Sequence, residues 1–230
     1  MKTIGLLGGM SWESSASYYQ LINEGVKEAL GGLHSAKIVL YSVDFQEIET
    51  LQHQGEWDKT ATLLAYAAQQ IESAGADFLL ICTNTMHRVA PQVEEHISIP
   101  LLHIADATAE EIVAAGIQKV GLLGTRFTME QDFYKGRLTD RYGLDVLIPN
   151  VTDRELIHQI IYDELCLGEI NDSSRQAYKQ IIKKLMDQGA EGIILGCTEI
   201  ALLVKPEDLP EVHLFDTTEI HAKKAVQWAL

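Results

Sequence analysis

The chain has 230 residues, 47% of them hydrophobic and 22% charged, which is typical of an ordinary globular protein. Its formal net charge of −15 argues against nucleic acid and anionic membranes as partners, because both are bound through concentrated lysine and arginine. No apolar run approaches the roughly 18 residues of a membrane helix, and residues 1–9 lack the apolar region of a signal peptide. We therefore expect a cytoplasmic location.

The cysteines and histidines do not form a recognisable metal-binding or redox motif. Cys82, Cys166 and Cys197 make no CxxC pair, and the eight histidines show no HxxxH or HxH spacing. The chain also lacks the GxGxxG and GK[ST] fingerprints of nucleotide sites. We expect free thiols, no metal and no nucleotide cofactor.

Short apolar runs that predict strands alternate with longer segments of helical periodicity. In chain order, the predicted strands are Thr3–Leu7, Lys37–Val43, Phe78–Cys82, Leu101–His103, Lys119–Leu123, Asp145–Ile148, Gly192–Leu195 and Val212–Phe215. Continuous apolar runs bounded by glycine indicate parallel strands that are buried on both faces. The alternation of strand and helix predicts an α/β fold with parallel sheets.

The helical segments carry recognisable start and stop signals. Apolar residues recur at every fourth position from Tyr18 to Leu30, and Gly31-Gly32 should end that helix. A second helix is predicted from Trp57 to the region of Gly75. Three capping boxes predict later helix starts, at Thr108–Glu111, Thr128–Gln131 and Thr152–Glu155.

Three pairs of segments resemble each other in the same order along the chain. They are Gly5–Met10 with Gly121–Arg126, Gly75–Ile81 with Gly189–Leu195, and Ile99–Thr108 with Leu209–Thr218, at offsets of 116, 114 and 110 positions. Such order indicates an internal duplication, and the offset is too long for a solenoid repeat. We expect two similar lobes, each a parallel sheet flanked by helices, formed by 1–101 plus 214–230 and by 102–213. The active site should lie in the cleft between them.

Ligands of open parallel sheets bind outside the carboxyl ends of the strands, so the residues there are the first candidates for chemistry. Extending the second repeat without gaps pairs Thr83 with Cys197. Asn84, Thr85 and Thr198 follow as short donors at predicted helix N-termini, which suit a carboxylate. A helix N-terminus should also lower the pKa of Cys197 below the free value of about 8.5.

This arrangement suits proton transfer on the two opposite faces of one carbon atom. One group removes the Cα proton and its partner returns a proton from the other side, which inverts the centre. A duplicated fold supplies equivalent residues on either side of a cleft. Backbone donors aimed at the substrate carboxylate would stabilise the planar carbanion.

Two further segments are candidates for substrate contact. Gly8-Gly9-Met10-Ser11 follows the first strand and predicts a cradle for a small carboxylate, with Ser11 as a helix N-cap. Thr125 occupies the equivalent place in the second half. Gln52 is a candidate contact for the substrate side chain, and its neutral amide makes homoserine a candidate beside aspartate and glutamate.

The chain resembles the aspartate/glutamate racemase family along nearly its whole length. The carrying segments are Ile4–Ser11, Cys82–His87, Leu123–Thr125 and Gly196–Glu199. The resemblance implies two α/β lobes, a two-base mechanism without pyridoxal phosphate or another cofactor, a small amino-acid substrate and a homodimer. It also implies that Asn84, Thr85 and Thr198 hold the substrate carboxylate and that Met10 and Thr125 line the site.

One departure from the family pattern affects the chemistry. The family has Cys-Asn-Thr in the first lobe, whereas here Thr83 precedes Asn84 and Cys82 lies one position early. Neighbouring strand residues point to opposite faces, so Cys82 should not substitute for the missing thiol. A hydroxyl is a far poorer base than a thiolate.

Two outcomes follow from this departure. In the first, which we favour, Cys197 abstracts the proton toward the L-enantiomer and Thr83 donates one, giving a racemase that is faster from one enantiomer. In the second, the chain is a one-cysteine decarboxylase or isomerase of the same superfamily. The sequence leaves the roles of Cys82, His87 and Glu164 open.

A candidate of another class is a non-catalytic binding protein for an amino acid or dicarboxylate. Such a protein would keep Asn84, Thr85 and Thr198 but would need no thiol at position 197. A low-pKa thiol protected by substrate would favour the enzyme.

Overall fold

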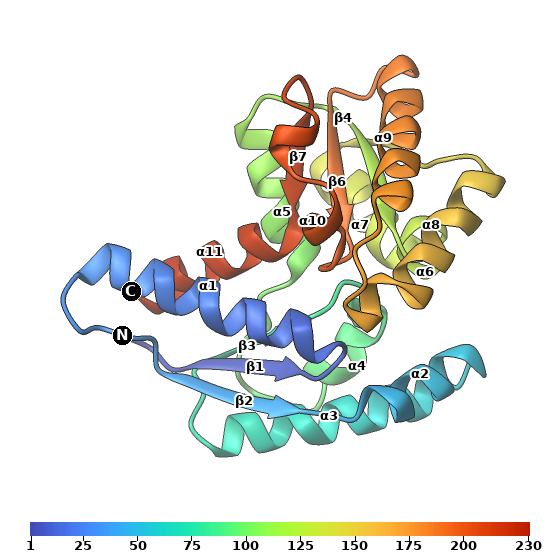
Figure 1. Cartoon of the computed structure of the whole chain (residues 1–230). Helices are drawn as coiled ribbons and strands as arrows, with labels where there is room; N and C mark the ends of the chain where they lie inside the picture. Colours follow the sequence, from blue (N-terminus) through green and yellow to red (C-terminus); the bar gives the residue numbers. More distant parts are fainter. The chain divides into compact units, whose positions relative to one another are not determined.

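The computed structural model describes all residues, 1–230, and divides into two compact units. The first unit comprises Met1–Ile104 with His221–Leu230, and the second comprises Ala105–Ile220. The sequence had suggested boundaries after residues 101 and 213. Both units are of the predicted α/β class, with one parallel sheet each (Figure 1). None of the helices combines the length and apolar character that a membrane span requires.

The sheet of the first unit has three parallel strands in the order β2-β1-β3. They are β1 (Ile4–Gly8), β2 (Ile38–Ser42) and β3 (Phe78–Ile81). Every residue of β1 and β3 is buried, whereas β2 at the edge is half-buried or exposed. The apolar runs of β1 and β3 are thus buried on both faces, as predicted, whereas the apolar run Ile38–Tyr41 of β2 is not, because β2 lies at the edge of the sheet.

Helices cover both faces of this sheet. The helical elements are α1 (Trp12–Leu30), α2 (Phe45–His53), α3 (Trp57–Ser73), η1 (Thr85–Val89), α4 (Ala90–Glu94) and the C-terminal α11 (Thr217–Ala229). One core cluster packs α3 against alternate residues of β1 and β3, and Figure 1 shows α3 along that face. The other cluster packs α1 and α11 against the remaining residues of both strands.

The predicted features of the first long helix, α1, are largely confirmed. Ser11 caps α1 by accepting a hydrogen bond from the Ser14 N–H, and Gly31 ends the helix at a φ of 72°. Tyr18 and Ile22 are buried as expected. Leu30, the last member of the apolar stripe, is instead 45% exposed, because the helix extends past the edge of the core.

The sheet of the second unit has four parallel strands in the order β5-β4-β6-β7. They are β4 (Lys119–Gly124), β5 (Asp145–Leu147), β6 (Gly192–Gly196) and β7 (His213–Asp216). The helical elements are α5 (Ile104–Ala114), α6 (Arg126–Glu130), α7 (Asp132–Tyr142), α8 (Val151–Asp163), η2 (Leu165–Leu167), α9 (Asp172–Asp187), α10 (Ile200–Leu203) and η3 (Pro206–Asp208).

The internal duplication is visible in the hydrogen bonds of each unit. In the first, the Asp77 carboxylate accepts from the Thr3 N–H at 2.6 Å and the Asp77 N–H donates to the Thr3 carbonyl. In the second, Glu191 accepts from the Lys119 N–H at 3.0 Å and its own N–H donates to the Lys119 carbonyl. The acid of the Gly-Ala-acid repeat thus holds the start of the first strand in both units.

Four local predictions were wrong. The segment Leu101–His103 makes only a single parallel bridge, between Leu79 and Leu101, because α5 already begins at Ile104. The three capping boxes do not start helices, since each threonine lies within its helix. The observed starts are Ile104, Arg126 after the cap Thr125, and Val151 after the cap Asn150.

Candidate active site

The sheet register places Thr83 and Cys197 at equivalent positions of their own units. Ile81 on β3 pairs with Leu7 on β1, and Leu195 on β6 pairs with Leu123 on β4. Thr83 and Cys197 each follow two residues after the paired position. Both therefore lie at the carboxyl end of the strand beside the first strand of their unit, where parallel sheets bind ligands.

In the first unit, Thr83 leads directly from β3 into the short helix η1. Its side chain is partly exposed, while Asn84 and Thr85 are buried at 2% and 5% exposure. The preceding residue, Cys82, is fully buried in the cluster that packs against α1, and burial raises the pKa of its thiol. Cys82 is thus a core residue, and the hydroxyl of Thr83 occupies the strand end.

His87 fixes the backbone around Thr83. Its Nδ1 lies 2.8 Å from the Thr83 carbonyl, and its Nε2 accepts a hydrogen bond from the Ile104 N–H at 3.2 Å. An accepting Nε2 requires that Nδ1 carries the proton and donates it to Thr83. The ring is 1% exposed and lies 4.4 Å from the ring of His103. His87 therefore connects the Thr83 turn to the start of α5.

The loop after β1 supports the same end of the first sheet. Met10 is 4% exposed and belongs to the core cluster on the α3 side. The Gly9 N–H donates a hydrogen bond to Ser15 Oγ at 2.8 Å. This N–H is therefore already used within the loop and is not a free donor for the predicted anion cradle. Ser14 Oγ donates to the Cys82 carbonyl at 2.8 Å and joins the loop to the Thr83 turn.

Gln52 lies near the C-terminal end of α2, which follows the edge strand β2. Its side chain is 2% exposed. A buried amide of this kind has both donor and acceptor capacity and no charge.

In the second unit, Cys197 begins the turn between β6 and α10. The Cys197 thiol donates a hydrogen bond to Glu199 Oε2 at 3.0 Å, and the Thr198 hydroxyl donates to the same oxygen at 2.7 Å. Cys197 is 8% exposed and Glu199 is 3% exposed. The turn thus holds a thiol, a hydroxyl and a buried carboxylate in direct contact.

The expectation of a low-pKa thiol at Cys197 was wrong. Burial, followed by the negative charge of Glu199, raises the pKa of Cys197 well above its ordinary value. The helix α10 has only four residues and does not offset these two effects.

Thr125 follows β4, whose last residue Gly124 pairs with Gly196, so Thr125 and Cys197 leave neighbouring strands at the same edge. Thr125 caps α6 by accepting a hydrogen bond from the Thr128 N–H at 3.3 Å. Its hydroxyl therefore already serves the helix start. The Thr198 hydroxyl is likewise engaged, because it donates to Glu199.

Further polar groups surround Cys197 from η2, α8 and α9. The charges of Cys197, Glu164 and Cys166 add to burial in raising the pKa of Tyr178, which places these groups in one cluster. Glu164 accepts a hydrogen bond from the Ser174 hydroxyl at 2.6 Å. Glu164 thus lies in the polar surroundings of the turn and is tied to α9.

Glu199 is the residue whose role the sequence did not reveal. The sequence shows that Glu199 directly follows Cys197-Thr198. It does not show the path of the backbone turn, which places the Glu199 carboxylate against the Cys197 thiol.

No group of three or more histidine, cysteine, aspartate or glutamate side chains is arranged to hold a metal ion.

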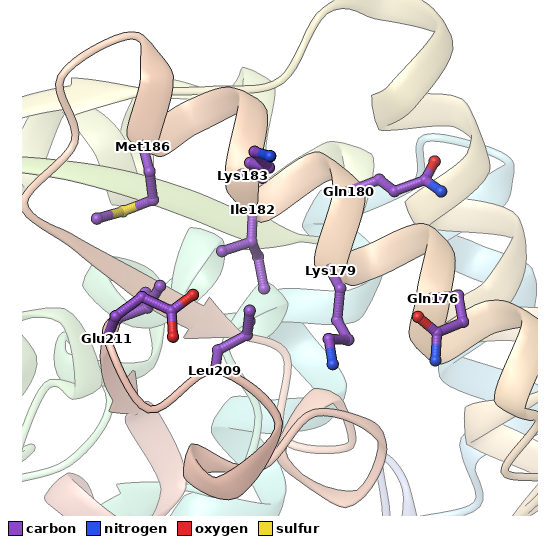
Figure 2. Close-up of a pocket in the computed structure, with 9 residues that line it drawn as sticks. Gln176, Lys179, Gln180, Ile182, Lys183, Met186, Leu209 and Glu211 are labelled. Atoms are coloured by element: carbon purple, nitrogen blue, oxygen red, sulfur yellow. The ribbon is translucent and has the colours of Figure 1, made fainter.

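A separate pocket lies in the second unit between α9 and the segment that leads to β7, with a volume of about 430 Å³. Figure 2 shows Ile182 and Leu209 pointing toward each other there. None of the predicted site residues lines this pocket.

The Asp/Glu/hydantoin racemase family model matches residues 7–225. The chain belongs to this family. As a family member it is an isomerase of the racemase type, which bears out the resemblance found in the sequence.

Solved structures of the family match the whole chain. A putative Asp/Glu racemase from Yersinia pestis is 58% identical, with 100% of this chain and 99% of that chain covered and a TM-score of 0.93. An aspartate racemase homologue from Pyrococcus horikoshii OT3 is 36% identical, with the same coverage and a TM-score of 0.86. The broad specificity amino-acid racemase RacX of Bacillus subtilis is 24% identical over 97% of this chain and 96% of its own.

Proposed function

We propose that this racemase inverts a small amino acid at Cα without a cofactor, using Cys197 and Thr83 as its two acid–base groups. Cys197 acts as the base toward the L-enantiomer, and the Thr83 hydroxyl donates a proton to the opposite face of the carbanion. The equivalent register of these two residues in the duplicated units carries the proposal. Because a hydroxyl is a poor base, the reaction should start faster from the L-enantiomer.

The substrate carboxylate is assigned to the donors at the two strand ends. Asn84 and Thr85 stand at the start of η1, and the backbone at Thr198 opens the turn before α10. Since the Thr198 hydroxyl donates its proton to Glu199, the donor that Thr198 offers to the substrate carboxylate is its backbone N–H. Met10 and Thr125 line the site.

Aspartate, glutamate and homoserine are the proposed substrates. The family supports the first two. The buried, neutral amide of Gln52 supports homoserine, whose side-chain hydroxyl needs a hydrogen-bond partner and no cation. We further propose a homodimer as the working assembly.

Isotope exchange tests this proposal. L- and D-forms of the three amino acids are incubated separately in deuterated water, and Cα exchange is followed by NMR beside optical rotation. We expect exchange and inversion, with a faster initial rate from the L-form. Cys197→Ser should reduce both by about 10²–10⁴-fold, the range of a lost acid–base group. Full activity of Cys197→Ser, or exchange into neither enantiomer of any substrate, would overturn the assignment.

The burial of Cys82 also favours a second candidate, a one-thiol decarboxylase or isomerase. With Cys82 in the core, Cys197 is the one thiol at the paired strand ends. Release of carbon dioxide from a malonate-type substrate, without Cα exchange of any amino acid, would identify that activity.

A further inference from the structure

The pocket beside α9 has the size and the lining of a small-molecule site. Its volume of about 430 Å³ lies within the range of about 300–1,000 Å³ that ligand pockets occupy. Ile182, Leu209 and Val212 line it with apolar side chains that are each at most 9% exposed. Met186 adds a flexible thioether, which adapts to the shape of a ligand. The pocket thus offers an apolar surface that a hydrocarbon group can cover.

The segment that faces α9 across this pocket is fixed at both ends. The Arg175 side chain on α9 donates a hydrogen bond to the Leu203 carbonyl at 2.8 Å. At the other end, β7 begins at His213, which pairs with Gly192 soon after α9 ends. The segment therefore runs antiparallel to α9, and the space between them is formed without a ligand.

The cations of α9 divide into two that form ion pairs and two that face the pocket. Arg175 and Lys184 each bind a carboxylate at 2.8 Å. Lys179 and Lys183 line the pocket and form no ion pair with the protein. They are four positions apart, so they lie on the same face of the helix. A chain with a net charge of −15 repels anions except where local cations outweigh this field, and these two lysines supply such a place.

The charges of the pocket are unevenly placed along its length. Figure 2 shows Gln176 and Lys179 at one end, and Met186 and Glu211 at the other. Glu211 is the one acidic residue of the lining. A negative group is therefore attracted near Lys179 and repelled near Glu211. This arrangement suits a ligand with one anionic end and one apolar end.

We propose that this pocket binds a small monocarboxylate with an apolar body, such as a medium-chain fatty acid. The carboxylate accepts hydrogen bonds from the ammonium groups of Lys179 and Lys183, and the hydrocarbon chain lies on Ile182 and Leu209. Dicarboxylates are selected against, because their second carboxylate would meet Glu211. The proposal concerns binding alone and does not rest on the proposed racemisation.

Calorimetric titration of the whole chain at neutral pH tests the proposal, with octanoate, hexanoate and octanedioate as probes. We expect saturable binding of octanoate at a single site. Hexanoate buries fewer methylene groups and should bind about tenfold more weakly. Octanedioate has the same chain length but a second charge, and should also bind at least about tenfold more weakly.

Substitutions in the pocket locate the site. Lys179→Gln and Lys183→Gln each remove one charge and should weaken octanoate binding about 3–10-fold. Met186→Trp fills the apolar end and should abolish it. Glu211→Gln should bring the affinities for octanedioate and octanoate closer together. Lys223→Gln on α11 is the matched control, because Lys223 is exposed and does not line the pocket, and it should leave the affinity unchanged.

Three results would overturn the proposal. The first is the absence of saturable octanoate binding with a Kd below about 10 mM. The second is octanedioate binding as tight as that of octanoate. The third is octanoate binding that neither lysine substitution weakens, which decides the matter even if Met186→Trp does not fold. Analytical ultracentrifugation tests the other occupant: a dimer that Met186→Trp dissociates would show that a second copy of the chain covers the pocket, and would contradict a fatty-acid site.

Discussion

At the scale of single residues, the turn after β6 explains why a glycine precedes the catalytic candidate. A Cβ at Gly196 would lie 2.7 Å from the Leu123 carbonyl oxygen and 2.9 Å from Leu122 Cδ1. The equivalent position of the first unit is Cys82, whose side chain is accommodated in the core. Close approach of β4 and β6 therefore sets the position of Cys197.

Gly196→Ala should reduce racemisation more than its effect on stability would suggest. The added methyl group must push β6 away from β4, which displaces the thiol and costs about 1–3 kcal/mol of unfolding free energy. Steady-state kinetics and urea denaturation measure the two effects. Gly136→Ala in the middle of α7, where an added Cβ meets only Asp132 and Asp140 of the same helix, is the control and should retain activity. Unchanged kinetics in Gly196→Ala would contradict this view of the turn.

The chemistry of individual side chains was the part least accessible from the sequence. The repeat aligned Thr83 with Cys197 because each residue lies at the same number of positions after the start of its strand, and this spacing can be read from the sequence. The contact of Cys197 with Glu199 depends on the path of a turn, and the direction of the thiol pKa depends on burial. Neither quantity is encoded in spacing, so the sequence predicted a lowered pKa where the structure gives a raised one.

At the scale of elements, a buried histidine joins the C-terminal helix to the first unit. The Nδ1 atom of His221, on α11, lies 2.8 Å from the Tyr18 hydroxyl oxygen on α1. The Nε2 atom of the same ring lies 2.8 Å from the Leu102 carbonyl oxygen. Leu102 accepts, so Nε2 carries the proton and Nδ1 accepts from Tyr18. Burial lowers the pKa of His221 to about 4.

This histidine predicts a loss of stability in mild acid. The pKa of His221 is 6.5 in the unfolded chain and about 4 in the folded chain. Between these two pH values, the imidazole is protonated in the unfolded chain and neutral in the folded chain. Stability therefore falls with falling pH across this window, by about 3 kcal/mol in total. His221→Gln can keep both hydrogen bonds but cannot titrate. Urea midpoints at several pH values should show a shallower dependence in the variant; parallel curves would contradict the assignment.

Element types were predictable, whereas several helix starts were not. Apolar runs such as those of β1 and β6 are long enough to identify buried parallel strands. The capping boxes failed because a threonine followed by an acid or amide is also common inside helices, and the observed caps Thr125 and Asn150 lie just upstream. Leu101–His103 failed because one residue of pairing does not make a strand.

At the scale of the whole molecule, the duplication is the feature that connects sequence, fold and function. Asp77 and Glu191 hold the first strands of their units through matching backbone hydrogen bonds. The two units also correspond at the carboxyl ends of their strands, where the turn with Thr83 in the first unit matches the turn with Cys197 in the second. If Thr83 and Cys197 are the acid–base groups, as we propose, the two equivalent units carry different groups, and we expect the two directions of racemisation to have unequal rates.

The split between exchange and inversion in Thr83→Val and Cys197→Ser tests this account most directly. In deuterated water with the L-substrate, Thr83→Val should still exchange the Cα proton, because Cys197 removes and returns it on one face, but should form little D-product. Cys197→Ser should lower both exchange and product formation by about 10²–10⁴-fold. Formation of D-product by Thr83→Val at the rate of the unmodified enzyme, or Cα exchange in Cys197→Ser at that rate, would contradict the assigned roles.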